Sequence, residues 1–309
     1  MLLNDIARSS LSLLSSWYPN EKISEKKNIY LLKKITRKIK KIKINHHDLQ
    51  KTHIKFNLKI LKFLKDRNLK NFLRINFIQK MFFLHNRYFV YKELKEIQKS
   101  QKWKFYQKIL KEDGVGNPVR YFLYLRSSGN RINHVYHLYL LEKNLKINLK
   151  KDIKKVFEFG GGYGCMARIF SKINRNIEYT CFDTSCLNLL QYYYLSHNNL
   201  NVGFSKNNKI FLSSRIKKKV ENFDLFIANW SISETPIHFR KKIMGKIIKS
   251  KYILISFQEK FENINNFKYF RDISNKLDKS FKIKIIRNKF YNGNIFNNQN
   301  HYFFFAKRI

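Results

Sequence analysis

The chain has 309 residues, enough to bury a substantial core, so it needs neither a disulfide nor a structural metal to fold. Its 44% of hydrophobic residues excludes a disordered chain, and its formal net charge is +42. Residues 1–100 carry +17, residues 101–150 carry +7 and residues 151–309 carry +18, so the charge forms no basic arm. Lys, Asn, Ile, Phe and Tyr are abundant and Gly, Pro and Ala are scarce. This bias favours drift in amino-acid composition, rather than selection for an anionic partner, as the origin of the positive charge. Binding of a specific nucleic acid is therefore not expected.

The cysteines and the N-terminal residues indicate in which cellular compartment the protein is expected. Cys165, Cys181 and Cys186 form no C-x-x-C pair, and their odd number gives no disulfide framework. The stretch "LSLLSSW" near the N-terminus is too short and too polar for a signal peptide or a spanning helix. The sequence therefore predicts a cytoplasmic protein without a transmembrane segment. The basic stretch "KKITRKIKKIKI" leaves loose contact with an anionic membrane surface open.

Residues 1–150 are predicted to form a mainly helical N-terminal region that covers the substrate side. Apolar residues recur at three- and four-residue spacing through 29–44 and 56–101, with lysines between them. A first break comes at "EDGVGNPVRY", where two glycines and a proline cluster, and "INHVYHLYLLEKNLKIN" predicts a further helix.

Residues 151–309 show a different rhythm, in which strands and helices alternate. The strands "KVFEF", "IEYTCF", "KIFL", "FDLFIAN" and "YILISF" are separated by helices or by a loop. Such alternation predicts a parallel sheet with crossover helices. "FKIKIIRNKF" and "HYFFFAKRI" are joined by a loop without a helix, which predicts an antiparallel edge pair. The expected fold class is α/β, with a Rossmann-like, mostly parallel sheet preceded by helices.

Four of the 10 glycines of the chain lie in "FEFGGGYGCMARI". They follow a predicted strand and open a predicted helix, in the pattern Glu158-x-Gly160-x-Gly162-x-Gly164. Glycine admits positive φ and close approach of a ligand, and a helix N-terminus offers unpaired N–H groups. The dinucleotide pattern G-x-G-x-x-G fails because Cys165 stands where its last glycine belongs, and no G-K-[ST] follows for a phosphate loop. The spacing is similar to the first motif of S-adenosylmethionine-dependent methyltransferases; a glycine cluster that serves packing alone is the alternative.

Asp183 ends the next predicted strand, 19 residues after Gly164. A carboxylate at this point can accept hydrogen bonds from both hydroxyls of a ribose. It can also cap the following helix, and the two roles are compatible.

Read in order, "GVGNP", "FEFGGGYGCMARIF", "QYYYL", "FDLFIANWSISETP", "YILISFQ" and a final His-Tyr strand resemble the bacterial sugar O-methyltransferases associated with surface polysaccharide synthesis. The resemblance covers roughly residues 80–309. Thr184-Ser185 replaces the Leu-Pro that often follows the aspartate, and Cys165-Met166 replaces a common Gly-Leu. Neither departure touches the glycines or Asp183.

The resemblance implies S-adenosylmethionine as the cofactor and a sugar, nucleotide sugar or glycan as the substrate. It implies that Glu158 and the glycine loop, with Gly160, Gly162, Tyr163 and Gly164, hold the methionine end. Asp183 would hold the ribose, and Ser213 and Ser214 would border the adenine.

A sugar hydroxyl is a poor acid and needs a base when its oxygen attacks the methyl group. The strand "FDLFIAN" ends where open α/β sheets place their sites, which selects the residues that follow it. Asn229 is assigned to the cofactor, Trp230 and Ser233 to the substrate, and Glu234 is the first choice for the base. Glu234 could instead serve only as a charge at a helix N-terminus. His301, which begins the last strand, is the rival base.

His134 and His137 lie three residues apart on a predicted helix, but no carboxylate cluster completes a metal site, so no metal is expected. Two other functions stay open: an RNA methyltransferase, which the charge would suit, and a non-catalytic binding protein derived from an enzyme. The sequence names neither the sugar, nor the hydroxyl, nor the oligomeric state.

Overall fold

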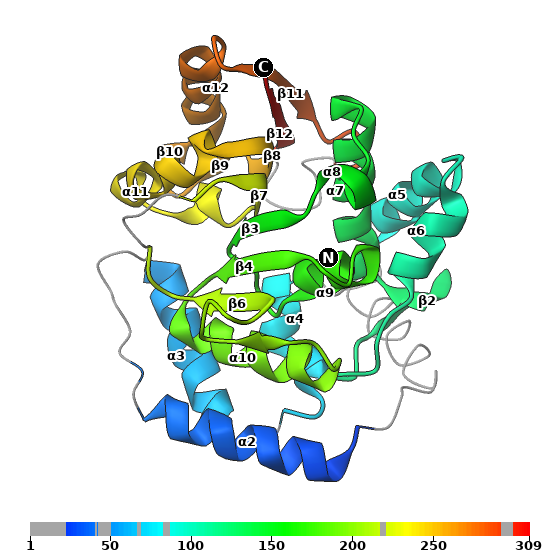
Figure 1. Cartoon of the computed structure of the whole chain (residues 1–309), viewed down its shortest axis with the longest axis vertical. Coiled ribbons are helices and arrows are strands. Elements are labelled where there is room, and N and C mark those ends of the chain that lie inside the picture. Colours follow the sequence, from blue (N-terminus) through cyan, green and yellow to red (C-terminus); the bar gives the residue numbers. More distant parts are fainter. Residues whose placement is uncertain are drawn as a thin grey trace.

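A computed structural model describes residues 23–40, 42, 51–66, 69–82, 87–216, 221–291 and 299–309. Within these residues eight strands form one sheet at the centre of the molecule, in the order β11-β12-β8-β7-β3-β4-β6-β5 (Figure 1). The strands are β3 (Lys155–Phe159), β4 (Glu178–Phe182), β5 (Val202–Gly203), β6 (Ile210–Ser213), β7 (Phe223–Asn229), β8 (Ser250–Gln258), β11 (Phe281–Arg287) and β12 (His301–Arg308).

The strands from β5 to β8 are parallel, and β12 pairs antiparallel with both β8 and β11. The expected fold class is therefore confirmed, including the antiparallel pair at one edge. The chain passes from β3 outward to β4 on one side, and returns to β7 on the other side of β3. This reversal creates a switch point between β3 and β7, where open α/β sheets form a crevice beyond the carboxyl ends of their strands.

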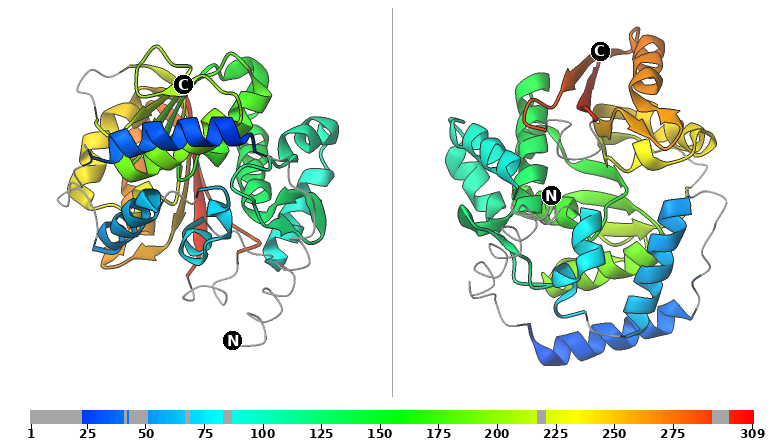
Figure 2. Two further views of the ribbon diagram at one scale, coloured as in Figure 1. Left: turned by 90° about the horizontal axis from the view of Figure 1, so that it is seen from below. Right: turned by 180° about the vertical axis from the view of Figure 1, so that it is seen from behind.

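Helices cover both faces of the sheet and give three layers, which Figure 2 shows with the sheet seen nearly edge-on in its left panel. Alternate side chains of the strands belong to two separate apolar clusters, as the period of two in a strand requires. The first cluster lies under α7 (Gly129–Leu145), α8 (Leu149–Asp152), α9 (Cys165–Ile173) and α10 (Ser185–His197). The second lies under α11 (Ile237–Ile248) and α12 (Asn266–Leu277), with the short η2 (Ile232–Glu234) beside it.

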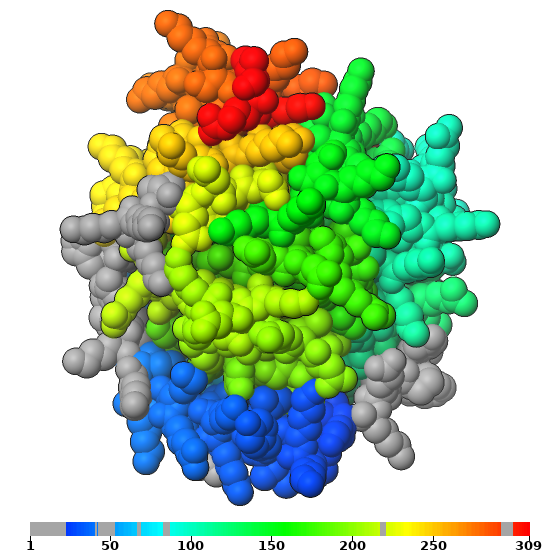
Figure 3. Space-filling model, in the orientation of Figure 1, coloured from blue at the N-terminus to red at the C-terminus, as the bar shows by residue number. Residues whose placement is uncertain are grey.

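The N-terminal helices share the first apolar cluster with the sheet, so one core joins the two parts of the chain. The helix α2 lies along α10, where the Tyr193 hydroxyl donates to Asn28 Oδ1 over 2.8 Å; the space-filling view shows it as a blue band beneath the rest of the chain (Figure 3). These elements are α2 (Glu25–Ile39), α3 (Lys51–Lys65), η1 (Phe72–Arg74), α4 (Asn76–Phe82), α5 (Tyr88–Gln98) and α6 (Trp103–Leu110), followed by the hairpin β1 (Arg120–Tyr121) and β2 (Tyr124–Ser128).

The structure departs from the sequence-based expectation in several places, and the short strands β1, β2 and β5 are among the elements that were not predicted. The periodic run 56–101 is divided among four elements, because the Leu73 N–H bonds the Gly116 carbonyl and the Arg74 Nε–H bonds the Asn117 carbonyl, which dock the chain on the glycine-rich turn. The helix α12 and the short pair β9 (Lys260–Phe261) and β10 (Ile264–Asn265) were not predicted. The predictions for residues 1–22 and 43–44 and for the loop residues 292–298 lie outside the described residues. No helix in the described ranges is long and apolar enough to cross a membrane.

A buried ion network fixes α7 and α9 behind the sheet. Arg131 is fully buried and contacts Glu112 and Asp113, each at 2.8 Å. Asp113 also receives two hydrogen bonds from Arg168. These cations hold the pKa of the Asp113 carboxyl well below its ordinary value, although burial alone would raise it. Removing one partner of such a network would leave a buried charge uncompensated, so we assign these residues to structure.

Candidate functional site

The candidate site lies at the carboxyl edge of the sheet, around the switch point. It has two halves. The turn half consists of Glu158 at the end of β3, the glycine turn 160–164, and Asp183 after β4. The β7 half consists of the residues after β7, Asn229–Glu234, together with His301 at the start of β12, which pairs with Gln258 at the end of β8.

The glycine turn has a backbone that only glycine adopts readily. Gly160 has φ +76° and Gly162 has φ +57°. A Cβ at Gly160 would lie 2.1 Å from Ser231 Cβ, and one at Gly162 would lie 2.6 Å from the Phe82 ring. The turn is therefore held between the loop after β7 and the N-terminal helix α4. Gly164 serves as the N-cap of α9.

Asp183 ties the turn to the second strand. One carboxylate oxygen accepts from the Gly162 N–H (2.9 Å) and from Gln191 Nε2 (3.3 Å), and the other from the Thr184 N–H (2.7 Å). Burial raises the pKa of Asp183 to about 7, against these hydrogen bonds, which favour the ionised form. The two parts of the sequence motif thus meet through a direct hydrogen bond.

Glu158 lies beneath the turn. Its carboxylate accepts from the Tyr179 hydroxyl (2.8 Å) and the Cys181 thiol (3.4 Å), and a Cβ at Gly161 would lie 3.0 Å from it. Burial raises the pKa of Glu158 to about 7, again against its hydrogen bonds. In this structure the side chain supports the turn from inside the protein.

The Tyr163 side chain lies in the aromatic core. It is buried, its hydroxyl accepts from Asn130 Nδ2 over 3.0 Å, and its ring contacts Phe82 and Tyr194 with centroids 5.2 and 5.1 Å apart. Only the backbone of this residue therefore belongs to the surface of the turn.

Asn229 and Trp230 occupy the end of β7. Asn229 Oδ1 lies 3.0 Å from His137 Nδ1 of α7 and accepts from the Ser256 hydroxyl over 3.3 Å. Trp230 has φ +57°, a left-handed conformation that costs free energy in a residue other than glycine. Its N–H donates to the Ser256 carbonyl over 2.7 Å, which helps to hold the strained backbone. Strain of this kind often marks a functional position.

His301 joins an aromatic group beside Trp230. Its ring centroid lies 5.8 Å from that of Trp230 and 3.8 Å from that of Tyr291. The His137 ring lies 5.9 Å from Trp230 on the other side. Burial lowers the pKa of His301 to about 3 and that of His137 to about 4, so both imidazoles are neutral near pH 7.

The side chains of Ser233 and Glu234 both contact Gln258, the last residue of β8. The Ser233 hydroxyl is fully buried and donates to Gln258 Oε1 over 2.8 Å. The Glu234 carboxylate is partly exposed, accepts from Gln258 Nε2 over 3.2 Å, and lies 3.3 Å from Nε2 of His53 in α3. The structure therefore places Asn229, Trp230, Glu234 and His301 at one edge of the sheet. Ser233, by contrast, is buried in the protein.

Three neighbours of the predicted residues were missed in the sequence: His53, Gln258, and His137 as the partner of Asn229. Nothing in the residues around His53 distinguishes it from other polar positions, and Gln258 was noticed only as the last residue of the "YILISFQ" motif. His137 was noticed only as a member of a histidine pair, whose ring centroids are 6.3 Å apart. Among the described residues no group of three or more His, Cys, Asp and Glu side chains is placed to hold a metal ion.

No protein-family model matches the chain, and neither does any curated protein. Among solved structures, the chain is similar to the methyltransferase domain of bacterial CtHen1, with 12% identity, a TM-score of 0.40, and coverage of 55% of this chain and 95% of that one. It is similar to the O-methyltransferase domain of StiE, with 12% identity, a TM-score of 0.41, and coverage of 55% and 72%. It is also similar to the precorrin-6y C5,15-methyltransferase of Geobacter metallireducens, with 10% identity, a TM-score of 0.38, and coverage of 56% and 88%. These similarities concern the fold alone.

Proposed function

We propose that the protein is an S-adenosylmethionine-dependent methyltransferase that methylates a sugar hydroxyl in glycan or surface polysaccharide synthesis. The observation that carries the proposal is the hydrogen bond from the Gly162 N–H to Asp183, which joins the glycine turn to the end of β4 at the switch point of the sheet. A ligand with both an amino-acid end and a ribose would use these two features together.

The turn half would hold the cofactor. The Asp183 carboxylate already contacts the turn, and its oxygen that accepts only from the Thr184 N–H has a further lone pair for a ribose hydroxyl. Glu158 and the turn 160–164 would position the methionine end, with Asn229 at the end of β7. Ser213 and Ser214 would border the adenine, next to Ser185, whose hydroxyl bonds Ser214 over 3.1 Å. When bound, S-adenosylmethionine supplies an electrophilic methyl group on a sulfonium.

The β7 half would hold the acceptor. Trp230 and the rings beside it offer flat apolar surfaces suited to the C–H face of a sugar, and Asn229 and Glu234 offer polar groups for its hydroxyls. Glu234 is the carboxylate on which removal of the hydroxyl proton would depend, with His301 as its rival. The N-terminal helical region would cover this side, since α3 carries a contact to Glu234.

A reducing, cytoplasmic setting is part of the proposal. Cys165, Cys181 and Cys186 are buried free thiols, which suits a compartment in which disulfides do not persist.

The proposal is tested first by binding and then by transfer. Calorimetry should show binding of S-adenosylhomocysteine in the micromolar range, about −8 kcal/mol. Methyl-labelled S-adenosylmethionine should then label methyl glycosides or extracted glycans, with the product identified by mass spectrometry. Binding of NAD without any S-adenosyl ligand would overturn the proposal. Binding without transfer to any acceptor would favour the non-catalytic alternative.

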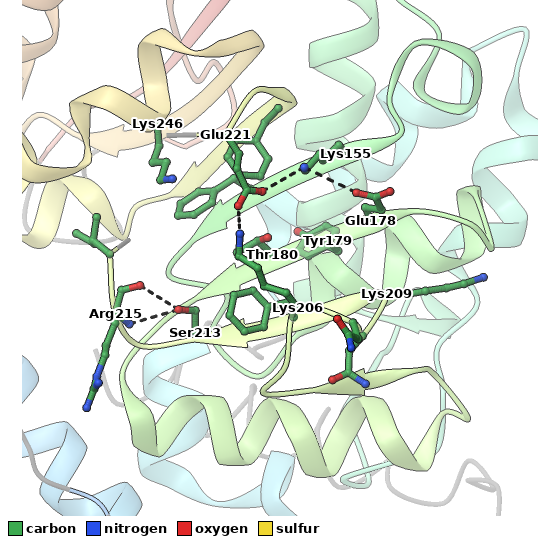
Figure 4. Close-up of a pocket in the computed structure, with 16 residues that line it drawn as sticks. Lys155, Glu178, Tyr179, Thr180, Lys206, Lys209, Ser213, Arg215, Glu221 and Lys246 are labelled. Atoms are coloured by element: carbon green, nitrogen blue, oxygen red, sulfur yellow. Dashed lines mark hydrogen bonds and ion pairs between the residues drawn. The ribbon is translucent and has the colours of Figure 1, made fainter. Parts of the chain in front are cut away.

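One observation favours RNA as a second candidate substrate. A hollow of about 310 Å³ lies on the sheet face beside β3, β4 and β6, and Figure 4 shows its lining. Phe157, Phe211 and Phe223 line it together with five basic side chains: Lys155, Lys206, Lys209, Arg215 and Lys246. Aromatic rings among cations suit single-stranded nucleic acid, but Glu221 already pairs with Lys155 and Lys206.

Salt separates this candidate from the first. Nonspecific RNA binding by a basic chain should collapse between about 50 and 200 mM salt. Tight binding of one RNA at the higher salt, lost in a Lys209→Glu/Arg215→Glu double variant, would place RNA above a sugar. Weak binding without sequence preference would leave the sugar proposal in place.

A further inference from the structure

Glu234 faces a histidine that comes from the N-terminal helical region. His53 lies in the first turn of α3, and its Nε2 is 3.3 Å from Glu234 Oε2. The contact joins residues that are 181 positions apart in the sequence. Seen from behind, α3 and α4 lie across the molecule in front of the sheet (Figure 2, right).

Several carboxylates act on the charge of His53. The carboxylates that act on its charge are Glu234, Asp183 and Glu262. Its ring centroid is 6.0 Å from that of Phe261, in the short strand β9. The imidazole therefore contacts the carboxylate proposed to serve the acceptor, and the charge of Asp183, proposed to hold the ribose, also favours its protonated form.

The other histidines near the site are less suited to take a proton. His137 is fully buried and His301 is 8% exposed, whereas the His53 side chain is 30% exposed. Among the residues that the structure describes, no carboxylate raises the pKa of either buried ring, and burial makes their charged forms unfavourable. His53 alone among the three combines access with an adjacent carboxylate.

We propose that His53 takes the proton from the acceptor hydroxyl, and that Glu234 orients its ring and stabilises the imidazolium that forms. The inference rests on the proposed methyl transfer. In the structure His53 Nε2 lies 3.3 Å from Glu234 Oε2 but outside hydrogen-bond geometry. A small rotation of the ring would direct Nε2–H at Glu234 and leave the lone pair of the neutral ring on Nδ1. This is the arrangement of a base oriented by a carboxylate, as in hydrolases that pair histidine with an acidic residue.

The proton and electron balance is simple. As the acceptor oxygen forms its bond to the methyl carbon, its proton passes to His53 Nδ1. The electron pair of the broken carbon–sulfur bond stays on sulfur, and the imidazolium later releases the proton to water. No oxidant or metal enters the step.

The first test needs no turnover. NMR titration of labelled histidines in the full chain gives the pKa of His53, assigned by its loss in His53→Gln. Burial lowers this pKa, but the contacts with Glu234 and the fields of Asp183 and Glu262 outweigh it and raise it above its ordinary value. We expect Glu234→Gln to reduce the proton affinity of His53 by about tenfold or more, and the exposed control His238→Gln to leave it unchanged. An unchanged His53 pKa in Glu234→Gln would overturn the pairing.

The second test separates this inference from the proposed function. S-adenosylhomocysteine should bind His53→Gln within about threefold of the wild type, while kcat for a methyl glycoside acceptor falls by about 10²–10⁴-fold. The His53→Gln/Glu234→Gln double variant should lose little more than either single variant, because the two residues act as a unit. Thermal unfolding checks that each variant is folded. If the wild-type protein does not bind S-adenosylhomocysteine, the proposed function itself is wrong. Binding with a kcat kept within about threefold in folded His53→Gln would overturn only the role of His53.

Discussion

The two halves of the site are assembled in different ways. The turn half consists of one continuous segment, Glu158 to Gly164, together with Asp183, which follows the next strand. The β7 half draws its side chains from α3, α7, β8 and β12 as well as from the segment after β7. A local motif can therefore specify the cofactor side, whereas the acceptor side depends on how distant elements pack. On this comparison, changes in the turn half should affect binding, and changes in the β7 half should affect turnover.

The largest effect is expected at Glu234. Glu234→Gln keeps the shape and the hydrogen bond to Gln258 but removes the charge, so kcat should fall by about 10²–10⁴-fold, or about 3–5 kcal/mol. Steady-state kinetics measure this, and calorimetry should give an unchanged affinity for S-adenosylhomocysteine.

His301→Ala is the matched comparison in the same half. If this variant shows the large loss in kcat and Glu234→Gln is nearly silent, the base is His301. If EDTA abolishes turnover and magnesium restores it, the metal-free mechanism fails whichever variant is affected.

The next effect is expected at Gly162. Gly162→Val places a branched side chain at φ +57° and against the Phe82 ring, so it should abolish cofactor binding and lower stability by about 1–3 kcal/mol. Calorimetry and thermal unfolding measure the two effects. Gly245→Ala, inside α11, is the control and should stabilise the protein by about 0.5–1 kcal/mol. Wild-type affinity in Gly162→Val would show that the turn does not contact the cofactor.

A smaller loss is expected at Asp183. Asp183→Ala removes a charged acceptor and should weaken S-adenosylhomocysteine binding by about 1.5–3 kcal/mol. Calorimetry against the exposed control Asp272→Ala measures this. An unchanged affinity would mean that Asp183 serves only the turn and the helix N-terminus.

The same comparison explains what could be predicted. The strand β3, the glycine turn and Asp183 follow from local rules, because strand pattern, positive-φ glycines and strand-end carboxylates are properties of short segments. The role of α3 could not be predicted, because His53 meets Glu234 only after the N-terminal helices pack on the sheet.

Two helix predictions show the limits of periodicity. Residues 56–101 read as a continuous helical pattern, yet hydrogen bonds to the distant carbonyls of Gly116 and Asn117 break it. The helix α12 had a usable signal at its start, where Asn265 caps it by accepting from the Lys268 N–H over 2.9 Å. Tertiary contacts override propensity in the first case, and a cap was overlooked in the second.

The last effect is expected from the buried carboxyl of Glu158, and it appears only as a dependence of stability on pH. Its pKa is raised from 4.5 to about 7, so between these values the folded protein keeps a proton that the unfolded chain has released. The free energy of unfolding contributed by this group must therefore fall as pH rises through that window and level off above it. Glu158→Gln has no proton to lose and keeps an acceptor for the Tyr179 hydroxyl.

Thermal unfolding from about pH 5 to 8 should show the stability of Glu158→Gln rising relative to the wild type, by about 2–3 kcal/mol. Asp183 contributes a slope of the same sign to both proteins, since burial raises its pKa as well, and so it largely cancels. Glu178→Gln, at an exposed position on β4, should show no such trend. A difference between Glu158→Gln and the wild type that stays constant with pH would mean that Glu158 remains ionised beneath the turn, and the turn half would then carry a fixed negative charge toward its ligand.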